Sequence, residues 1–420
     1  MLRAEWFVGI DWAADAHDIC IVDRAGEICQ RGDIEHTAAA LQALVTALLE
    51  RAQGDPSRVA IGIEVPRGAL VELCIARGFV VYAINPKQVD RFRDRFTVAG
   101  AKDDPRDARV ISDALRTDPQ AFRRVRLDHP LVIQLREWSR LDDDLREELG
   151  RLTNQLRDLV YRSMPGVLAV CPAADEPWFW ALLAEAPTPA TQRGVSERHL
   201  ARLLRDHRIR RIGASELHQM LQQPAVYSAP GVVEAVAAHV QLLLPRVTLV
   251  ASQRREVERH LKRLLDALEA ELPAGDQREH ADVAIIRSMP GVGIRVAARM
   301  LAEASQPLVD REYHVLRTWM GVAPVTKRTG RRHRPTVVMR YACNRYLRDG
   351  GYHWARTAAQ NDPASRAYYR ALRARGHSHG RALRSVADRG LRILVTLLTR
   401  GRLFDPNYAH PCAVTLAAGA

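Results

Sequence analysis

A stripe of apolar residues between Leu131 and Leu159 most constrains the fold of this chain. The stripe advances by threes and fours through Leu131, Leu135, Trp138, Leu141, Leu145, Leu149, Leu152, Leu156 and Leu159. That spacing, with charged residues between, predicts one long helix of a coiled-coil arm. "VTLVASQRREVERHLKRLLDALEAEL" (247–272) predicts a second long amphipathic helix. The two helices can form an antiparallel pair within one chain or an oligomer interface, and the pattern fits both.

The first 125 residues have a different pattern. Short apolar strands are predicted at 5–12, 59–65 and 78–84, with a hairpin over 17–32 that turns at Ala25 and Gly26. Helical patterns over 37–52 and 66–78 lie between them, the second ending at Gly78. Strands joined partly by a hairpin and partly by helices predict a mixed sheet flanked by helices. The segment 171–230 is rich in Pro and then Arg, and its pattern predicts no particular organisation.

Composition places the chain among basic, globular proteins of two or three domains. It has 420 residues and a net charge of +13, and residues 301–405 hold 21 Lys and Arg against 7 Asp and Glu. The first 300 residues hold 41 basic and 42 acidic side chains, so the excess lies in the last quarter and indicates a polyanionic partner. No membrane span or signal peptide is expected. The six cysteines include no CxxC pair and are expected to be reduced thiols of a cytoplasmic protein. His17 and Cys20 are expected to be core or surface residues and not metal ligands.

Carboxylates gather at the ends of predicted elements. Asp11 ends the first strand, Glu64 ends another, and Asp103, Asp104 and Asp107 start a helix. Acids at a helix start can cap it, but three of them with two strand-end acids fit a divalent-metal site for phosphoryl transfer on a ribonuclease H-like fold. Helical spacing allows Asp107 to share a face with Asp104 or with Asp103. Asp15, Asp18, Asp23 and Asp113 are interpreted as turn or surface residues.

The hexapeptide "RSMPGV" occurs twice, at 162–167 and 287–292. Its second copy continues through Gly293 into an apolar helix and is similar to a helix-hairpin-helix, in which Gly291 and Gly293 would face a nucleic-acid phosphate. A plain interhelical turn explains it equally well. The first copy lacks the second glycine and is expected to be a structural turn.

The motifs "GIDWAADAHDICIVD", "IEVPRG", "INPKQVDRF" and "GAKDDPRDAR" resemble, in this order, the N-terminal domain of IS110-family transposases. The family pattern is D-E-D-D on a RuvC-like fold, and its last motif, K-x-D-x-x-D-A, falls on Lys102, Asp104 and Asp107. The resemblance therefore implies a metal quartet of Asp11, Glu64, Asp104 and Asp107, with magnesium as the cofactor. It leaves Asp103 as a capping or solvated residue and places Lys102 beside the acids or a phosphate.

The C-terminal "WMGVAPVTKRTGRRHRPTVVMRYACNRYLRDGGYHWAR" continues the resemblance. In the family, a serine before a glycine in this cationic loop joins covalently to DNA, and Thr329 stands at that place. Thr329 is then the nucleophile, or Thr326 or another hydroxyl replaces it, or this copy is catalytically impaired; we favour the first. Tyr341, Tyr346 and Tyr352 are expected to pack or stack. The residues expected to bind nucleic acid are Lys102, Gly291, Gly293, Lys327, Arg328, Arg331, Arg332, Arg334, Arg340 and Arg345.

The resemblance implies a DNA recombinase of an insertion element, with an α/β RNase H/RuvC-like catalytic domain (1–125), a coiled-coil arm with an inserted segment (126–275) and a basic, mostly α-helical C-terminal domain (276–410). Its implied partners are element-end and target DNA, a structured guide RNA, and further copies of the chain in a dimer or tetramer, in the bacterial cytoplasm at the nucleoid. The alternatives are a RuvC-like junction endonuclease without a covalent intermediate and a nucleic-acid-binding protein without catalysis. The four-acid pattern favours an enzyme.

Overall fold

The computed structural model describes residues 3–13, 15–64, 66, 68–84, 89–90, 92, 104–126, 128–224, 226–229, 231–271, 281–327 and 336–406. The chain forms two compact units, Met1–Asp128 (unit 1) and His129–Ala420 (unit 2). The further boundary predicted at 275 falls outside the described residues and stays a prediction.

Unit 1 contains a six-stranded mixed sheet with the order β3-β2-β1-β4-β5-β6. Its strands are β1 (Trp6–Asp11), β2 (Ala16–Val22), β3 (Ile28–Glu35), β4 (Val59–Ile63), β5 (Val80–Ala83) and β6 (Arg123–Arg124). The first three strands form an antiparallel meander, whereas β4 and β5 run parallel to β1. The predicted mixed sheet and hairpin are confirmed, and this architecture is consistent with a ribonuclease H-like domain.

Helices cover the two faces of this sheet. Apolar side chains of α1 (Ala38–Arg51) and α2 (Ala69–Ala76) join one core with alternate residues of β1 and β4, among them Ile10 and Ile63. The opposite face carries α4 (Asp104–Thr117), whose Ile111 lies in a second core with Phe7 and Ala60. The period-2 alternation of a strand thus assigns each side chain to the α1 face or the α4 face.

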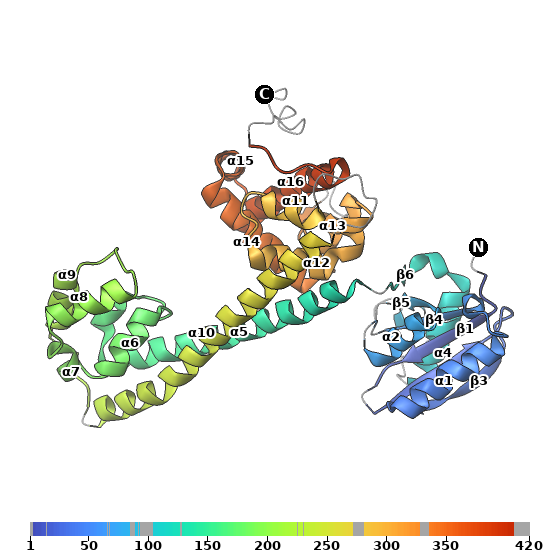
Figure 1. Ribbon diagram of the computed structural model, residues 1–420, viewed down its shortest axis with the longest axis horizontal. Helices are drawn as coiled ribbons and strands as arrows, with labels where there is room; N and C mark the ends of the chain where they lie inside the picture. Colours follow the sequence, from blue (N-terminus) through green and yellow to red (C-terminus); the bar gives the residue numbers. More distant parts are fainter. Residues whose placement is uncertain are drawn as a thin grey trace. The chain divides into compact units, whose positions relative to one another are not determined.

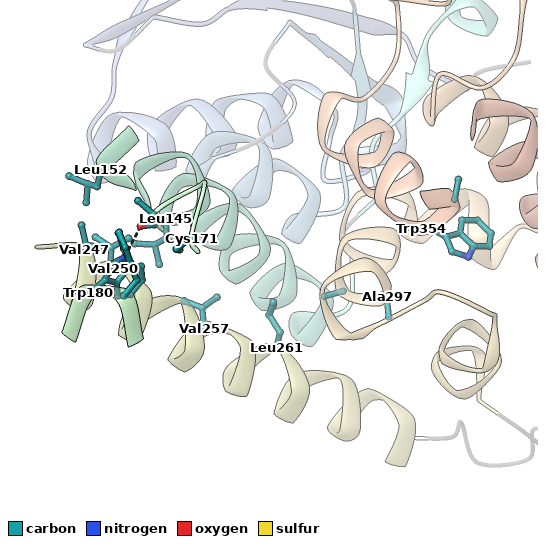
Figure 2. Close-up of a cluster of buried hydrophobic side chains, with 14 of the residues drawn as sticks. Leu145, Leu152, Cys171, Trp180, Val247, Val250, Val257, Leu261, Ala297 and Trp354 are labelled. Atoms are coloured by element: carbon teal, nitrogen blue, oxygen red, sulfur yellow. Dashed lines mark hydrogen bonds between the residues drawn. The ribbon is translucent and has the colours of Figure 1, made fainter. Parts of the chain in front are cut away.

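Two long helices, α5 (Pro130–Ser163) and α10 (Val232–Ala270), form the stem of unit 2 (Figure 1). His129, the N-cap of α5, lies 3.2 Å from Glu271, which follows α10, so the helices are antiparallel. Figure 2 shows Val257 and Leu261 of α10 on the side that faces α5. The two helices therefore pair within one chain, which is the first of the two arrangements that the sequence pattern allows. The coiled-coil geometry of their contact stays a prediction.

Residues 165–221 fold as a small helical lobe between the two stem helices. It contains the turn η3 (Pro165–Ala169) and the helices α6 (Pro177–Glu185), α7 (Pro189–Arg193), α8 (Glu197–Asp206) and α9 (Ala214–Leu221). The first "RSMPGV" copy runs from α5 into η3 as a structural turn, as expected. The buried residues Trp178, Phe179 and Leu200 join the lobe to the core of the stem.

The rest of unit 2 is mostly helical, as predicted. Its elements are α11 (Asp282–Ser288), α12 (Ile294–Val309), α13 (Tyr313–Trp319), the hairpin strands β7 (Val325–Lys327) and β8 (Thr336–Val338), α14 (Arg345–Asn361), α15 (Pro363–Ala374) and α16 (His379–Arg400). Two ion pairs fasten α12 to the stem: the buried pair of Arg299 with Asp143, and the half-buried Arg140 with the buried Glu303 at 3.1 Å.

By length and apolar composition, α10 is the one helix among the described residues that could cross a membrane. Its most apolar 18-residue window has a mean hydropathy of 1.4 and is 33% buried within the protein. A helix that packs in a protein core passes the same test, and α10 packs along α5, so the feature is weak evidence for a membrane span.

Candidate active site

Two predicted site residues lie side by side at the end of the central parallel strands. Asp11 is the last residue of β1, and Glu64 directly follows β4. Ile10 pairs with Ile63 in parallel register, so Asp11 and Glu64 occupy the next position on strands about 4.8 Å apart. Both side chains are half-buried.

Two glycines show which face of the sheet these carboxylates occupy. A Cβ at Gly9 would lie 1.9 Å from the Ala108 carbonyl oxygen, and one at Gly62 would lie 2.8 Å from Ile111 Cγ2. Both glycines therefore face α4, which approaches the sheet closely because they have no side chain. Asp11 and Glu64 stand two residues further along the same strands, so they also belong to the α4 face.

The direction of α4 brings its first turn to the same end of the sheet. At the C-terminal end of α4, the Arg116 guanidinium lies 3.1 Å from where a Cβ of Gly26 would stand. Gly26 lies in the β2–β3 turn, at the end of the sheet opposite Asp11, so α4 runs antiparallel to β1. Ala108 of α4 lies against Gly9, and Asp11 is two residues further along β1, a distance of about 6.6 Å. Four or five helical residues cover the same distance, so the first turn of α4 lies level with Asp11.

Asp107 lies in this first turn and is only 3% exposed. A carboxylate so deeply placed is costly to desolvate unless it is hydrogen-bonded, paired or bound to a cation. The structure thus brings Asp11, Glu64 and Asp107 to one end of the sheet, although their ligand atoms are not all within 4.8 Å of one another. The side chain of Asp104 and all of Lys102 and Asp103 lie outside the described residues.

Asp18, interpreted from the sequence as a turn or surface residue, lies in a strand of the same region. It belongs to β2, directly opposite Asp11 in the antiparallel register, and Asp33 of β3 is opposite Asp18 in turn. Cross-strand partners share a face, so three aspartates form a row on the α4 face. Asp18 is therefore a strand residue and not a turn residue. Asp18 is two residues before the buried Cys20 and so shares its face of β2, which is the sequence signal that could have placed it on the α4 face.

His17, on the other face of β2, supports the turn that follows Asp11. Its ring is fully buried, its Nδ1 accepts from the Ala13 N–H at 3.4 Å, and its Nε2 lies 2.8 Å from His36 Nδ1. Trp12 stacks on it with ring centroids 6.0 Å apart. Burial lowers the pKa of His17, and the nearby His36 lowers it further. His17 and Cys20 are core residues, as expected.

The predicted nucleophile loop spans the end of the β7–β8 hairpin, whose last described pair is Lys327 with Thr336. Thr329 and the predicted phosphate-binding residues Arg328, Arg331, Arg332 and Arg334 lie outside the described residues, as does the side chain of Lys327. Arg340 is half-buried, whereas Arg345 is exposed and pairs with Glu147 of α5 at 2.8 Å.

The three tyrosines that are expected to pack or stack differ in their surroundings. Tyr346 packs beneath the Arg140 guanidinium, 5.3 Å from the ring centroid, and Tyr352 lies edge-on to His353. Tyr341 is 78% exposed. Tyr346 thus packs within the protein, whereas the exposed rings of Tyr341 and Tyr352 are available to stack on a ligand.

The turn before α12 packs against α14. Gly291 has a φ of +80°, and a Cβ there would lie 2.5 Å from the Ala358 backbone nitrogen. Trp354 donates its indole N–H to the Pro290 carbonyl at 2.9 Å. These contacts explain, by packing alone, why glycine occupies position 291. Gly293, the N-cap of α12, is exposed, and its phosphate role stays a prediction like that of Gly291.

One metal-like cluster occurs elsewhere among the described residues. Ligand atoms of Cys171, Asp175 and Glu176 lie within 4.8 Å of one another. Burial raises the pKa of the Cys171 thiol, and Glu176 is already engaged by Arg211 at 2.5 Å. The Trp178 indole N–H donates to the other carboxylate oxygen of Glu176 at 2.8 Å, so both oxygens of this acid already have protein partners.

A mixed sheet of this order, with acids at its central strand ends and on a late helix, defines the class of ribonuclease H-like nucleic-acid-processing proteins. A transposase profile for the DEDD domain of IS110 elements matches residues 8–165, and one for the IS116/IS110/IS902 transposase family matches residues 283–370. The chain belongs to the IS110 family of insertion-element transposases, which are DNA-processing enzymes and bind DNA.

Relatives are similar over different shares of the chain. A mini-circle putative transposase for IS117 from Streptomyces coelicolor is 30% identical over 423 residues, which cover 98% of each protein. A putative transposase from Sinorhizobium fredii is 44% identical over 211 residues, and the match spans 50% of this chain and 58% of that relative. An uncharacterized protein of insertion element IS900 from Mycobacterium paratuberculosis is 28% identical over the whole of both chains.

Proposed function

We propose that this transposase cuts and rejoins DNA by phosphoryl transfer at the acidic end of the unit 1 sheet. The observation that carries the proposal is the convergence of Asp11, Glu64 and the buried Asp107. Phosphoryl transfer depends on charge stabilisation and positioning of the phosphate, which carboxylate-bound cations provide.

Asp11, Glu64, Asp104 and Asp107 would hold the divalent cation, with Mg²⁺ as the expected ion. The donor set fits, because Mg²⁺ takes carboxylate oxygens and retains several water ligands, so it does not need every carboxylate to bind it directly. When bound, the cation neutralises phosphate charge and favours ionisation of the attacking oxygen. Asp18 would orient water or add negative charge beside Asp11, and Lys102 would balance the acids or contact a phosphate.

Thr329 is the proposed nucleophile. Its Oγ1 forms a bond to phosphorus while the bond from phosphorus to a deoxyribose oxygen breaks, and the hydroxyl proton ends on that leaving oxygen. The support is its position before Gly330 in the cationic loop, where the family has serine. The additional methyl group of threonine restricts its rotamers, so we expect it to react more slowly than serine.

The basic excess of residues 301–405 supports a large phosphate-binding surface in unit 2. We propose that a structured RNA occupies part of it and supplies target specificity by base pairing, and that the chain acts as a dimer or tetramer.

Metal binding is tested by calorimetric titration of Mg²⁺ into the full chain. Asp107→Asn and Glu64→Gln should weaken binding at least tenfold, and Asp18→Asn by roughly tenfold or less. Glu50→Gln, an exposed change on α1, is the matched control and should bind as wild type does. Equal Mg²⁺ affinity in all variants would refute the metal site.

The nucleophile is tested by recombination between element ends and flanking sequence. Thr329→Ala should abolish joining, whereas Thr329→Ser should retain or increase it. Suicide substrates should trap a phosphothreonine–DNA adduct with the wild type. Joining without an adduct, or activity in Thr329→Ala, would instead favour the junction endonuclease.

A further inference from the structure

The helical lobe of residues 165–221 lies outside both matched family profiles from residue 166 onward, and it carries a basic surface to which the proposed function assigns no role. Residues 193–211 contain seven arginines and only two acids, Glu197 and Asp206. All seven arginines are exposed: Arg193, Arg198, Arg202, Arg205, Arg208, Arg210 and Arg211. We call this surface the lobe arginine patch.

The centre of the lobe arginine patch is one face of α8. Arg198, Arg202 and Arg205 follow the spacing i, i+4, i+7, which aligns them along the helix over about 10 Å. The opposite face of α8 buries Leu200, Leu203 and Leu204. The helix is therefore fixed by its leucines with a row of guanidinium groups directed to solvent.

Among the described residues, few of these arginines have a partner for their side chains. Arg211 pairs with Glu176 at 2.5 Å, and Arg202 lies 2.9 Å from His199 Nδ1. Between described residues, no ion pair or side-chain hydrogen bond involves the guanidinium groups of Arg198 or Arg205, or those of Arg193, Arg208 and Arg210. A run of unneutralised like charges repels itself, so its natural complement is a polyanion.

The turn after α8 also retains an arginine where glycine is favoured. Arg208 has a φ of +58° in the left-handed position that ends a helix, and the Ile209 N–H closes the turn onto the Leu204 carbonyl at 2.8 Å. A non-glycine residue there costs roughly 1 kcal/mol. Arg311 has a similar φ of +57°, but both of its terminal nitrogens bind Asp282. Within the described chain, no such contact accounts for Arg208.

We propose that the lobe arginine patch binds the phosphate backbone of duplex DNA. Guanidinium groups bind phosphate oxygens with paired N–H donors, and a helix that presents a row of them follows a backbone without reading bases. Duplex DNA is the proposed partner of the patch because DNA is the substrate of the transposase class. The patch consists of other residues than the cationic loop and the acidic site, and it adds affinity without taking part in the chemistry.

The test measures binding of the full chain to a 40-base-pair duplex of arbitrary sequence across a salt series. The triple variant Arg198→Gln, Arg202→Gln, Arg205→Gln should bind at least tenfold more weakly at about 0.1 M salt, and its log–log salt slope should fall by about 2 to 3. The corresponding Lys triple keeps the charges and should retain most of the affinity and slope.

A second triple, Arg151→Gln, Arg157→Gln, Arg255→Gln, removes the same charge from exposed positions on the stem and should bind as wild type does. The lobe triple should leave the Mg²⁺ affinity of the acidic site unchanged, which separates this inference from the catalytic proposal. The inference is overturned if the lobe triple binds DNA as wild type does, if the stem triple loses equal affinity, or if the lobe triple loses affinity only for a structured RNA of equal length. Unchanged thermal unfolding of the lobe triple shows that the loss is not a folding defect.

Discussion

Gly9→Ala should displace α4 from the sheet and with it the carboxylate of Asp107. The new Cβ would stand 1.9 Å from the Ala108 carbonyl oxygen, whereas Cβ atoms essentially never approach closer than 3.0 Å. The helix must therefore retreat by roughly 1 Å or more. Because the obstacle is backbone and not the tip of a flexible side chain, we expect a cost of about 3 kcal/mol, the upper part of the range for overpacking.

Hydrogen–deuterium exchange of the full chain measures this cost locally. Peptides of α4 should exchange on the order of a hundredfold faster in Gly9→Ala, while those of α14 in unit 2 remain unchanged. Gly32→Ala on β3 is the matched control, because no described atom lies within 4 Å of its added Cβ. A shift of about 1 Å at the site should also reduce recombination by about a hundredfold. Exchange of α4 at the same rate in both variants would refute the close-packing argument.

Three further predictions follow from contacts described above. Gly291→Ala should lower the free energy of unfolding of unit 2 by about 2–4 kcal/mol in urea titrations, because of its positive φ and its approach to α14. Gly293→Ala meets open space and should cost less than about 1 kcal/mol, the preference for glycine over alanine at an N-cap. Equal effects would contradict the difference in their surroundings. Asp143→Ala leaves the buried Arg299 without its partner and should lower the same quantity by about 3–5 kcal/mol, and a neutral result would show that water replaces the carboxylate. Burial holds the pKa of His17 below its usual value of 6.5, so below that pH the unfolded chain binds a proton that the folded chain excludes. Unit 1 should therefore lose stability as the pH falls through 6.5. His17→Gln should weaken this pH dependence of the free energy of unfolding, and an unchanged pH profile would contradict the prediction.

Much of unit 1 was predictable because its signals are local. Alternation and apolar runs identified β1 and β4, and the acids at their ends followed from the positions of Asp11 and Glu64 in the sequence. The side-by-side placement of these acids depends on the order of the strands in the sheet. The sequence pattern, a hairpin followed by strands joined through helices, does not fix that order. Asp18 was missed because its strand position becomes meaningful only when its partner in β1 is known.

Unit 2 was harder to predict because its decisive contacts are long-range. The long helices were evident from their periodicity, but their pairing within one chain rests on contacts such as Asp142 with Arg254, 3.3 Å apart. Gly291 belongs to a motif that serves equally as a DNA contact or a packing turn, and only the approach of α14 supplies its packing role. The lobe had no periodicity long enough to predict its short helices.

The antiparallel stem places both ends of the lobe excursion next to each other. The Ser228 hydroxyl lies 3.5 Å from the Arg162 carbonyl oxygen, so the chain leaves α5 and returns toward α10 at nearly one point. The length of the chain between them therefore does not set the register of the stem helices. Insertions and deletions can accumulate in this excursion while α5, α10 and the helices fastened to them by Arg299 and Arg140 keep their arrangement.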